Sequence, residues 1–246
     1  MIEKVCQVIK KANRLTVFTG AGISVESGIP PFRGENGLWS KFDPIFLDLN
    51  YFHKNPTQSW KLIKQIFYDF FGKAKPNKAH FVLAKMEQNH LIHDIITQNI
   101  DNLHQAAGSQ NVYEFHGTAQ RLICTGCHTT FSGSELKNLI KIEPYPICPN
   151  CQSLLKPDFV FFGEAIPETA YSQAIEDANM SDVFLLIGTT GEIQPASSIP
   201  LMAKQNKATV IEINISPSNY TKTITDFFLQ GKSTEILKKI KMELRI

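Results

Sequence analysis

Four of the five cysteines form two Cys-x-x-Cys pairs, Cys124 with Cys127 and Cys148 with Cys151. A two-residue spacer lets both sulfurs of a turn face one ion, and two such pairs suit a tetrahedral zinc site. Because four thiolates complete the coordination shell, no position is left for a water, and the one expected zinc is structural. Unligated thiols or a redox pair are the alternative, although a redox motif needs no second pair. Cys6 is expected in the core.

Polar side chains follow the apolar run that ends at Thr97, namely Gln98, Asn99 and Asp101. If this run is a parallel strand, they lie at its carboxyl end, where open α/β sheets bind ligands. His116 stands just ahead of the first cysteine pair and is expected in a cleft between domains. An imidazole with a pKa near 6.5 is suited to taking a proton from a hydroxyl, although a lone histidine is more often structural or solvated.

The sequence Gly20-Ala21-Gly22-Ile23-Ser24 directly follows a short apolar run. Glycines in this position let backbone N–H groups approach a pyrophosphate at the start of a helix. The dehydrogenase fingerprint would need a third glycine where this chain has Val25, and no acidic residue closes a second strand about 20 residues on. A hydride-transferring Rossmann enzyme is therefore disfavoured, and a simple glycine turn between strand and helix is the structural alternative.

A Gly/Pro-bounded loop over residues 27–34 carries Phe32 and Arg33. The phenyl ring could cover a ring of a cofactor, and the guanidinium could reach a phosphate or an acidic neighbour. Loops of this kind close over cofactors. Two further polar triplets, Gly188-Thr189-Thr190 and Asn214-Ile215-Ser216, end apolar runs, so that their hydroxyls and amides could bind ribose or adenine edges. Either triplet alone is also typical of a helix cap or a turn.

A parallel sheet with helices on both faces would place these groups along one edge. Short apolar runs, which predict buried parallel strands, occur at 15–19, 94–97, 159–162, 183–187 and 209–213. Helical patterns occur at 2–12, 77–89 and 167–179. The alternation of the two predicts an α/β fold with a Rossmann-like, doubly wound parallel sheet.

Two segments do not fit this alternation and are interpreted as insertions: 42–75, which is aromatic and helical in period, and 123–156, which carries the cysteine pairs. They are expected to form a smaller domain, a zinc ribbon with helices. The larger, nucleotide-binding domain would then be discontinuous and consist of residues 1–41, 76–122 and 157–246.

Length and charge restrict the class of protein. The chain has 246 residues, 43% of them hydrophobic and 20% charged, which is typical of a globular protein. With 25 Lys+Arg against 23 Asp+Glu the net charge is +2, so no binding of nucleic acid or of an anionic membrane is expected. No apolar run approaches the roughly 18 residues that span a bilayer, and charges interrupt the N-terminal segment where a signal peptide would be apolar. A cytoplasmic protein is expected.

Taken in order, the motifs resemble those of the sirtuin family of NAD-dependent protein deacylases, in a member of bacterial or archaeal type. The similarity runs from about residue 14 to the C-terminus. The motifs are Gly20-Ala21-Gly22-Ile23-Ser24, Gly28-Ile29-Pro30-x-Phe32-Arg33-Gly34, Gly37-Leu38-Trp39, Thr97-Gln98-Asn99-Ile100-Asp101-x-Leu103-His104, His116-Gly117, both cysteine pairs, Phe162-Gly163-Glu164, Gly188-Thr189-Thr190 and Asn214.

The resemblance implies an extended NAD+ site and a cleft for an acyl-lysine protein or peptide. The residues expected to bind NAD+ are Gly20, Ala21, Gly22, Ile23, Ser24, Phe32, Arg33, Trp39, Gln98, Asn99, Ile100, Asp101, Gly188, Thr189, Thr190, Asn214, Ile215, Ser216 and Ser233. The residues expected to pair with the peptide as an added strand are Val160, Phe161, Phe162, Gly163 and Glu164.

The resemblance also implies the reaction. The amide oxygen of the acyl-lysine attacks the ribose carbon as nicotinamide leaves, and His116 then deprotonates a ribose hydroxyl. Asn99 and Asp101 would position water and ribose. The products would be free lysine, nicotinamide and O-acyl-ADP-ribose.

Two departures from the family pattern matter for specificity. Members that remove succinyl or malonyl groups carry a Tyr and an Arg where this chain has Ile63 and Ile66. Because an apolar pocket leaves an acidic acyl group unpaired, we expect deacetylation or removal of longer fatty acyl groups, and no desuccinylase or demalonylase activity. Gly191 and Glu192 stand where the family usually has apolar residues, so this chain departs from the family pattern beside the expected adenosine contacts. A protein ADP-ribosyltransferase and a zinc-ribbon binding module on a degenerate nucleotide fold are the alternative functions.

Overall fold

A six-stranded sheet in the order β3-β2-β1-β7-β8-β9 forms the centre of the larger lobe. The computed structural model describes residues 1–33 and 37–246, so Gly34 of the predicted cofactor loop lies outside the described residues. The strands are β1 (Leu15–Thr19), β2 (Asp94–Thr97), β3 (Val112–Glu114), β7 (Val183–Ile187), β8 (Thr209–Asn214) and β9 (Phe227–Gln230). All neighbouring strands pair in parallel, which confirms the predicted Rossmann-like sheet.

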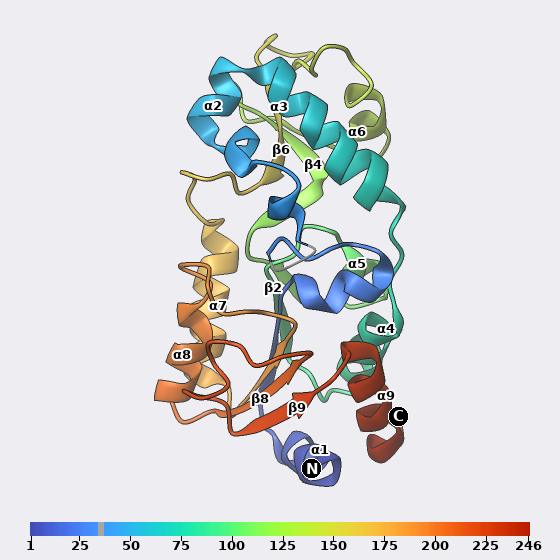
Figure 1. Ribbon diagram of the computed structural model, residues 1–246, viewed down its shortest axis with the longest axis vertical. Helices are drawn as coiled ribbons and strands as arrows, with labels where there is room; N and C mark the ends of the chain where they lie inside the picture. Colours follow the sequence, from blue (N-terminus) through green and yellow to red (C-terminus); the bar gives the residue numbers. More distant parts are fainter. Residues whose placement is uncertain (34–36) are drawn as a thin grey trace.

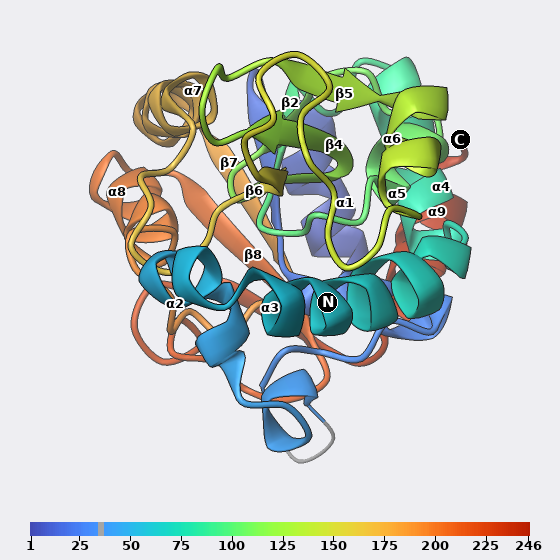
Figure 2. The same ribbon diagram turned by 90° about the horizontal axis from the view of Figure 1, so that it is seen from above.

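Helices cover both faces of this sheet because side chains alternate between the faces along each strand. Leu15 and Val17 pack with helices α1 (Ile2–Lys11), α4 (Lys78–Gln88) and α9 (Ser233–Leu244). Phe18 points to the other face, where α7 (Glu168–Met180) and α8 (Ser198–Gln205) lie. Figure 2 shows α7 and α8 on one side of the sheet and α4 and α9 on the other. Strands β3 and β9, at the two edges of the sheet, were not expected from the sequence.

The smaller lobe contains a three-stranded antiparallel sheet in the order β5-β4-β6. Its strands are β4 (Gly117–Cys124), β5 (Thr130–Ser132) and β6 (Leu155–Phe159). Helices α2 (Leu49–Lys54), α3 (Pro56–Ile63) and α6 (Gly133–Leu139) lie around it, at the opposite end of the molecule from α1 and the two termini (Figure 1). Shorter helical segments are η1 (Ala21–Ser27), η2 (Leu38–Ser40), η3 (Pro44–Leu47), η4 (Lys64–Phe70), η5 (Phe71–Lys73) and α5 (Leu103–Ala106).

One predicted strand is wrong. The run 159–162 is not a parallel strand of the large sheet: β6 ends at Phe159 and pairs antiparallel with β4, and the residues after it form an irregular segment. Phe161 is buried in the core of the smaller lobe, whereas Phe162 is 49% exposed. A short apolar run has no property of its own that separates a central strand from a loop that lines a cavity.

The proposed division of the chain at residues 122 and 157 stays a prediction, and strands β4 and β6 run across these two boundaries. Residues 42–75 and 123–156 both contribute to the smaller lobe. No helix in the part of the chain that the structure describes has the length and hydrophobicity to cross a bilayer.

Trp60 joins the helical insertion to the three-stranded sheet. Its side chain is fully buried in the aromatic core of the smaller lobe, and Nε1 donates a hydrogen bond of 2.9 Å to the carbonyl of Leu155 at the start of β6. Helix α3 begins at Pro56, where a missing N–H costs nothing because the first turn of a helix has no acceptor for it. The indole is therefore held by a regular helix and fixes the distance between that helix and β6.

We expect Trp60→Ala to lower the free energy of unfolding by about 3–5 kcal/mol, because it opens a large cavity and leaves the Leu155 carbonyl without its donor. Chemical denaturation measures the change. Trp60→Phe is the matched control, since it keeps most of the apolar volume and loses only the hydrogen bond. A loss for Trp60→Ala no greater than that for Trp60→Phe would contradict the role of this side chain in joining α3 to β6.

Candidate active site and zinc centre

A cavity of about 480 Å³ lies between the carboxyl edge of the parallel sheet and the smaller lobe. Gly20, Gln98 and Gly188 line it, and each directly follows a strand of the large sheet. The strand order changes direction between β1 and β7, the position at which open α/β sheets bind ligands. The smaller lobe contributes Phe67 and Phe159. The predicted site residues that line the cavity are Gly20, Ala21, Phe32, Arg33, Trp39, Gln98, Asn99, Ile100, His116, Val160, Phe161, Phe162, Gly163, Glu164, Gly188, Thr189 and Thr190.

The glycine loop after β1 packs backbone to backbone against the loop after β7. The N–H of Gly22 donates to the carbonyl of Gly188 over 2.9 Å, and a Cβ atom on Gly22 would lie 2.6 Å from the Gly188 Cα. Gly188 itself has φ +62°, a conformation that residues with side chains rarely adopt. The glycines thus satisfy a structural need before any ligand is considered, and they leave main-chain atoms at the cavity wall.

Ser24, Asn99 and Asp101 form one hydrogen-bond network beside the cavity. The Ser24 hydroxyl donates to Oδ2 of Asp101 over 2.7 Å, and Nδ2 of Asn99 donates to Ser24 Oγ over 3.2 Å. The other carboxylate oxygen of Asp101 accepts the N–H of Leu103 over 3.0 Å. Burial raises the pKa of Asp101, and the hydrogen bonds from Ser24 and Leu103 oppose the rise. Asn99 reaches the cavity wall, while Ser24 and Asp101 lie behind it and fix the orientation of the amide.

His116 has a defined tautomer in this structure. Its Nδ1 lies 3.0 Å from the backbone carbonyl of Gln98. Because a carbonyl only accepts, Nδ1 carries the proton, which leaves the lone pair on Nε2. Burial lowers the pKa of His116, and the hydrogen bond to Gln98 works in the opposite direction. A neutral imidazole in the cavity wall can therefore act as a general base at neutral pH.

An aromatic cluster holds the predicted cofactor loop. The rings of Phe32 and Trp39 have centroids 5.3 Å apart, and Trp39 makes an edge contact with Phe46 at 6.2 Å. Arg33 lies 3.9 Å from Glu192, so of the two partners expected for it the structure supplies the acidic neighbour. Glu192 is one of the residues at which this chain departs from the sirtuin pattern.

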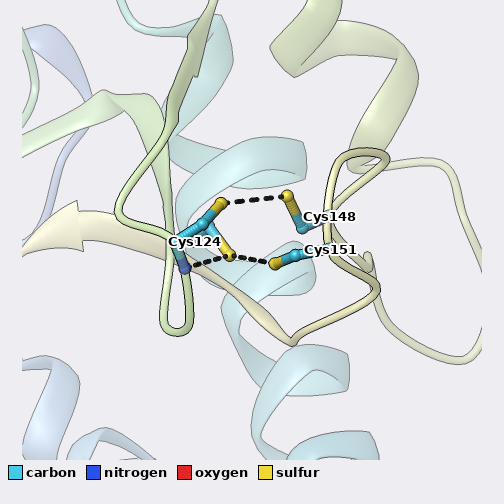
Figure 3. Close-up of side chains that lie close together, drawn as sticks. Cys124, Cys148 and Cys151 are labelled. Atoms are coloured by element: carbon cyan, nitrogen blue, oxygen red, sulfur yellow. Dashed lines mark hydrogen bonds between the residues drawn. The ribbon is translucent and has the colours of Figure 1, made fainter.

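The four paired cysteines come together at one end of β4. Their sulfur atoms all lie within 4.8 Å of one another, with Cys124 and Cys151 at 3.4 Å and Cys127 and Cys148 at 3.7 Å. Figure 3 shows Cys148 and Cys151 facing Cys124. Two sulfurs bound at about 2.3 Å to one tetrahedral ion lie roughly 3.8 Å apart, so the cluster fits a zinc ion.

The surroundings of the cysteines act on their thiolate forms in opposite directions. The N–H groups of Gly126 and Cys127 point at the Cys124 sulfur, over 3.3 and 3.4 Å. Burial raises the pKa of Cys124 to about 11, whereas a hydrogen bond from Ser153 lowers the pKa of Cys151 to about 6. In this cluster a zinc ion would be held by four protein ligands and would join the turn after β4 to the turn before β6.

Comparison with known proteins identifies the family. Residues 20–195 match the family described as the Sir2 family, and a protein named NAD-dependent protein deacylase from Pyrococcus furiosus is 43% identical over 248 residues, 100% of this chain and 98% of the relative. The chain belongs to the Sir2 family. NAD-dependent protein deacetylase 1 of Pyrobaculum aerophilum is 39% identical and covers 99% of this chain and 95% of its own.

Solved Sir2 structures have the same fold. A mutant Sir2 homologue in complex with ADP ribose superposes with a TM-score of 0.93 at 38% identity, over 100% of this chain and 97% of its own. A Sir2 complex with a p53 peptide and NAD+ has a TM-score of 0.90 at 30% identity, over 99% and 98% of the two chains.

Some predicted cofactor residues of this Sir2 family member lie outside the cavity wall. Those buried or partly buried behind the wall are Gly22, Ile23, Ser24 and Asp101. Asn214 donates from Nδ2 to the carbonyl of Thr189 over 2.9 Å and so supports the loop after β7. Ile215 and Ser216 are exposed. Ser233 is buried at the start of α9, and its Oγ has no hydrogen-bond partner within the described residues. Their roles toward a cofactor stay predictions.

The cavity wall also contains residues that the sequence motifs do not single out. They are Pro31, Leu47, Phe67, Phe159, Ala165, Ile166, Ile193, Gln194 and Pro195. The excess of aromatic residues in 42–75 was a signal for Phe67, since an insertion rich in rings must bury some of them against a neighbour. Leu47 and Ile193 had no such signal, because single aliphatic residues in irregular segments follow no period.

We expect Cys148→Ser to lose the one zinc ion per chain and to lower the melting temperature, because the turns that carry the two pairs are then no longer joined. Elemental analysis by mass spectrometry and thermal denaturation measure the two effects. Cys6→Ser is the matched control, since Cys6 is equally buried but lies in the large lobe, and the variant should retain zinc. Retention of a full zinc equivalent by Cys148→Ser would argue against a four-thiolate centre.

Proposed function

We propose that this chain is an NAD-dependent protein-lysine deacylase, which transfers the acyl group of a modified lysine to ADP-ribose and releases nicotinamide. The single observation that carries the proposal is the composition of one cavity. The glycine loops, a neutral His116 with its lone pair on Nε2, and the segment 160–164 all line it. The relatives are named NAD-dependent protein deacylase or deacetylase, and their length matches that of this chain.

The residues of the cavity fit NAD+. Main-chain atoms of Gly20 and Gly188 lie at its wall, where no side chain keeps a phosphate away. Phe32 contributes an aromatic side chain to the wall, and the side-chain amide of Gln98 donates to Thr189 Oγ1 over 3.0 Å. The buried Ser233 hydroxyl, which has no partner among the residues that the structure describes, supports a polar ligand beyond the cavity wall. When bound, NAD+ supplies a ribose carbon whose bond to nicotinamide can break.

The chain's own residues then position the reactants and move one proton. His116 takes the proton of a ribose hydroxyl onto Nε2, and the carbonyl of Gln98 stabilises the imidazolium that forms through its bond to Nδ1. The Ser24 and Asp101 network holds the Asn99 amide toward the cavity, where it orients water and ribose. The lobes enclose the reacting atoms and limit the access of water.

The segment 160–164 supports peptide binding as an added strand. The N–H groups of Val160, Phe161 and Phe162 are bonded within the protein, to His116, Glu164 and Leu47. Among the described residues, the carbonyl of Val160 and both backbone groups of Gly163 have no such partner. These groups remain for hydrogen bonds to an extended substrate.

The walls near the smaller lobe suit an uncharged acyl group. Leu47, Phe67, Phe159 and Phe161 are apolar, and Ile63 and Ile66 are buried in the same core. Among the described residues that line the cavity, Arg33 is the only Lys or Arg, and it lies 3.9 Å from Glu192. An acidic acyl group would lose its hydration there without gaining an ion pair.

We expect His116→Ala to reduce turnover at least about 100-fold, because it removes the base. Mass spectrometry of an acetylated peptide incubated with NAD+ measures loss of acetyl and formation of O-acetyl-ADP-ribose. Zinc content and the affinity for ADP-ribose should be unchanged. In the wild type, kcat/KM should be flat near neutral pH and fall only below about pH 6.5, since burial lowers the pKa of the base and imidazolium is inactive. Full activity of the variant would remove the assigned base, and ADP-ribose transferred to protein would favour a transferase.

We expect acetyl and myristoyl peptides to be substrates and kcat/KM for a succinyl peptide of the same sequence to be lower by about 100-fold or more, because its carboxylate is buried unpaired. The comparison uses one peptide backbone, so that only the acyl group differs, and incubations without NAD+ serve as the control. Equal turnover of the succinyl and acetyl peptides would contradict an apolar acyl site.

A further inference from the structure

Lys156 is a charged side chain in the core of the smaller lobe, with only 6% of its surface exposed. Its ammonium group donates to the carbonyl of Pro157 over 2.9 Å and to that of Phe159 over 2.7 Å. A third contact, of 2.9 Å, joins it to Oε2 of Glu164. An ammonium group has three protons, and each of them finds an acceptor here.

Glu164 extends the set of contacts back to the same segment. Its Oε2 also accepts the N–H of Phe161 over 2.7 Å, and its own N–H donates to the carbonyl of Phe161 over 3.0 Å. The Lys156 ammonium lies 4.2 Å from the centre of the Phe161 ring, within the range of a cation–π contact. Residues 157–164 therefore curve around one buried cation.

The same segment forms part of the cavity wall. Phe159 to Glu164 line the cavity, and the N–H of Val160 donates to the carbonyl of His116 over 2.8 Å. On its outer side, Phe162 exchanges backbone hydrogen bonds with Leu47 and Leu49, over 2.9 and 3.1 Å. The imidazole of His116 is held separately, by the carbonyl of Gln98, so a shift of the segment would mainly change the position of the peptide-facing carbonyls.

A buried ion pair stabilises a fold little, since a well-packed apolar residue at the same place is often as good or better. Burial lowers the pKa of Lys156, and the charge of Glu164 opposes this shift. The attraction between the two charges therefore offsets part of the cost of removing the ammonium group from water. An apolar side chain would fill the space but would leave the carbonyls of Pro157 and Phe159 without donors. What the ion pair adds is a fixed conformation of the segment.

We propose that Lys156 and Glu164 form a clamp that holds residues 159–163 in the conformation that binds an extended acyl-lysine peptide. Lys156 is a positioning residue, because it acts through the segment and not on the substrate. The proposal rests on the proposed deacylase function and assigns a determinant of its peptide affinity.

The test compares Lys156→Met with the wild type in steady-state kinetics on an acetylated peptide. The KM for the peptide should rise by about tenfold or more, because the conformation is no longer fixed, while kcat changes less than about threefold and the KM for NAD+ less than about twofold. Lys156→Arg retains charge and donors and should stay within about threefold of the wild type. Arg121→Ala is the matched control. Arg121 of β4 pairs with Asp158 of β6, the strand that carries Lys156, at a more exposed position, and the kinetic constants of this variant should equal those of the wild type.

Hydrogen–deuterium exchange supplies a readout that does not depend on activity. Exchange of the amides of residues 160–164 should increase in Lys156→Met and not in Arg121→Ala. If the wild type fails to turn over acyl-lysine peptides, the proposed function is wrong, and the exchange data still decide whether the clamp exists. If Lys156→Met does not fold, Glu164→Gln decides instead, because it keeps an acceptor for Phe161 and removes only the charge. Unchanged exchange and peptide KM in a folded variant, or an equal rise in both KM values, would overturn the proposal.

Discussion

Two loops that must approach within backbone contact determine the geometry of the cavity. β1 and β7 are neighbours in the sheet, and the loops that leave them meet where Gly22 donates to Gly188. At 2.6 Å there is no room for a side chain between them. The contact keeps the carboxyl edge of the sheet open at the point where the strand order changes direction. Because no side chain of the glycine loops covers this edge, the polar residues after β2 and β7 can face one ligand.

The smaller lobe forms the wall of the cavity opposite the large sheet. Its strand β4 begins at Gly117, directly after His116, and β3 of the large sheet ends two residues before the histidine. His116 therefore lies where the chain passes from one sheet to the other. Gly117 has φ +73°, and a Cβ there would lie 2.4 Å from the carbonyl of Asp158 in β6. The four cysteines and the aromatic core around Trp60 keep β4 and β6 together. They therefore affect the site by fixing the position of the chain between β3 and β4, where His116 lies.

Polar groups away from solvent are paired in a way that serves orientation more than stability. Ser24 and Asp101 hold an amide at the cavity wall, and Lys156 and Glu164 hold a turn of the chain. Ser24 and Lys156 are the buried members of these pairs, and each would be costly to bury without a partner. These pairs consequently restrict the segments to a small range of conformations, which suits a site where two substrates must meet at one carbon atom.

Sequence alone determined those features that depend on neighbours in the chain. The cysteine spacing predicted the four-cysteine cluster. The glycines that follow the apolar run 15–19 predicted the loop at the edge of the sheet. The runs 15–19, 94–97 and 183–187 agree with β1, β2 and β7, because strands buried on both faces are apolar throughout. The ordered motifs were specific enough to predict the Sir2 family.

Tertiary structure decided what depends on distant partners. It placed the run 159–162 in a cavity wall and not in the large sheet, and it gave Arg33 an ion pair with Glu192. It also made Lys156 a buried residue, which no local pattern around that lysine indicates. The reason is physical: periodicity records which side of an element is apolar, whereas the identity of the group across a cavity or under a turn depends on contacts between segments far apart in the chain.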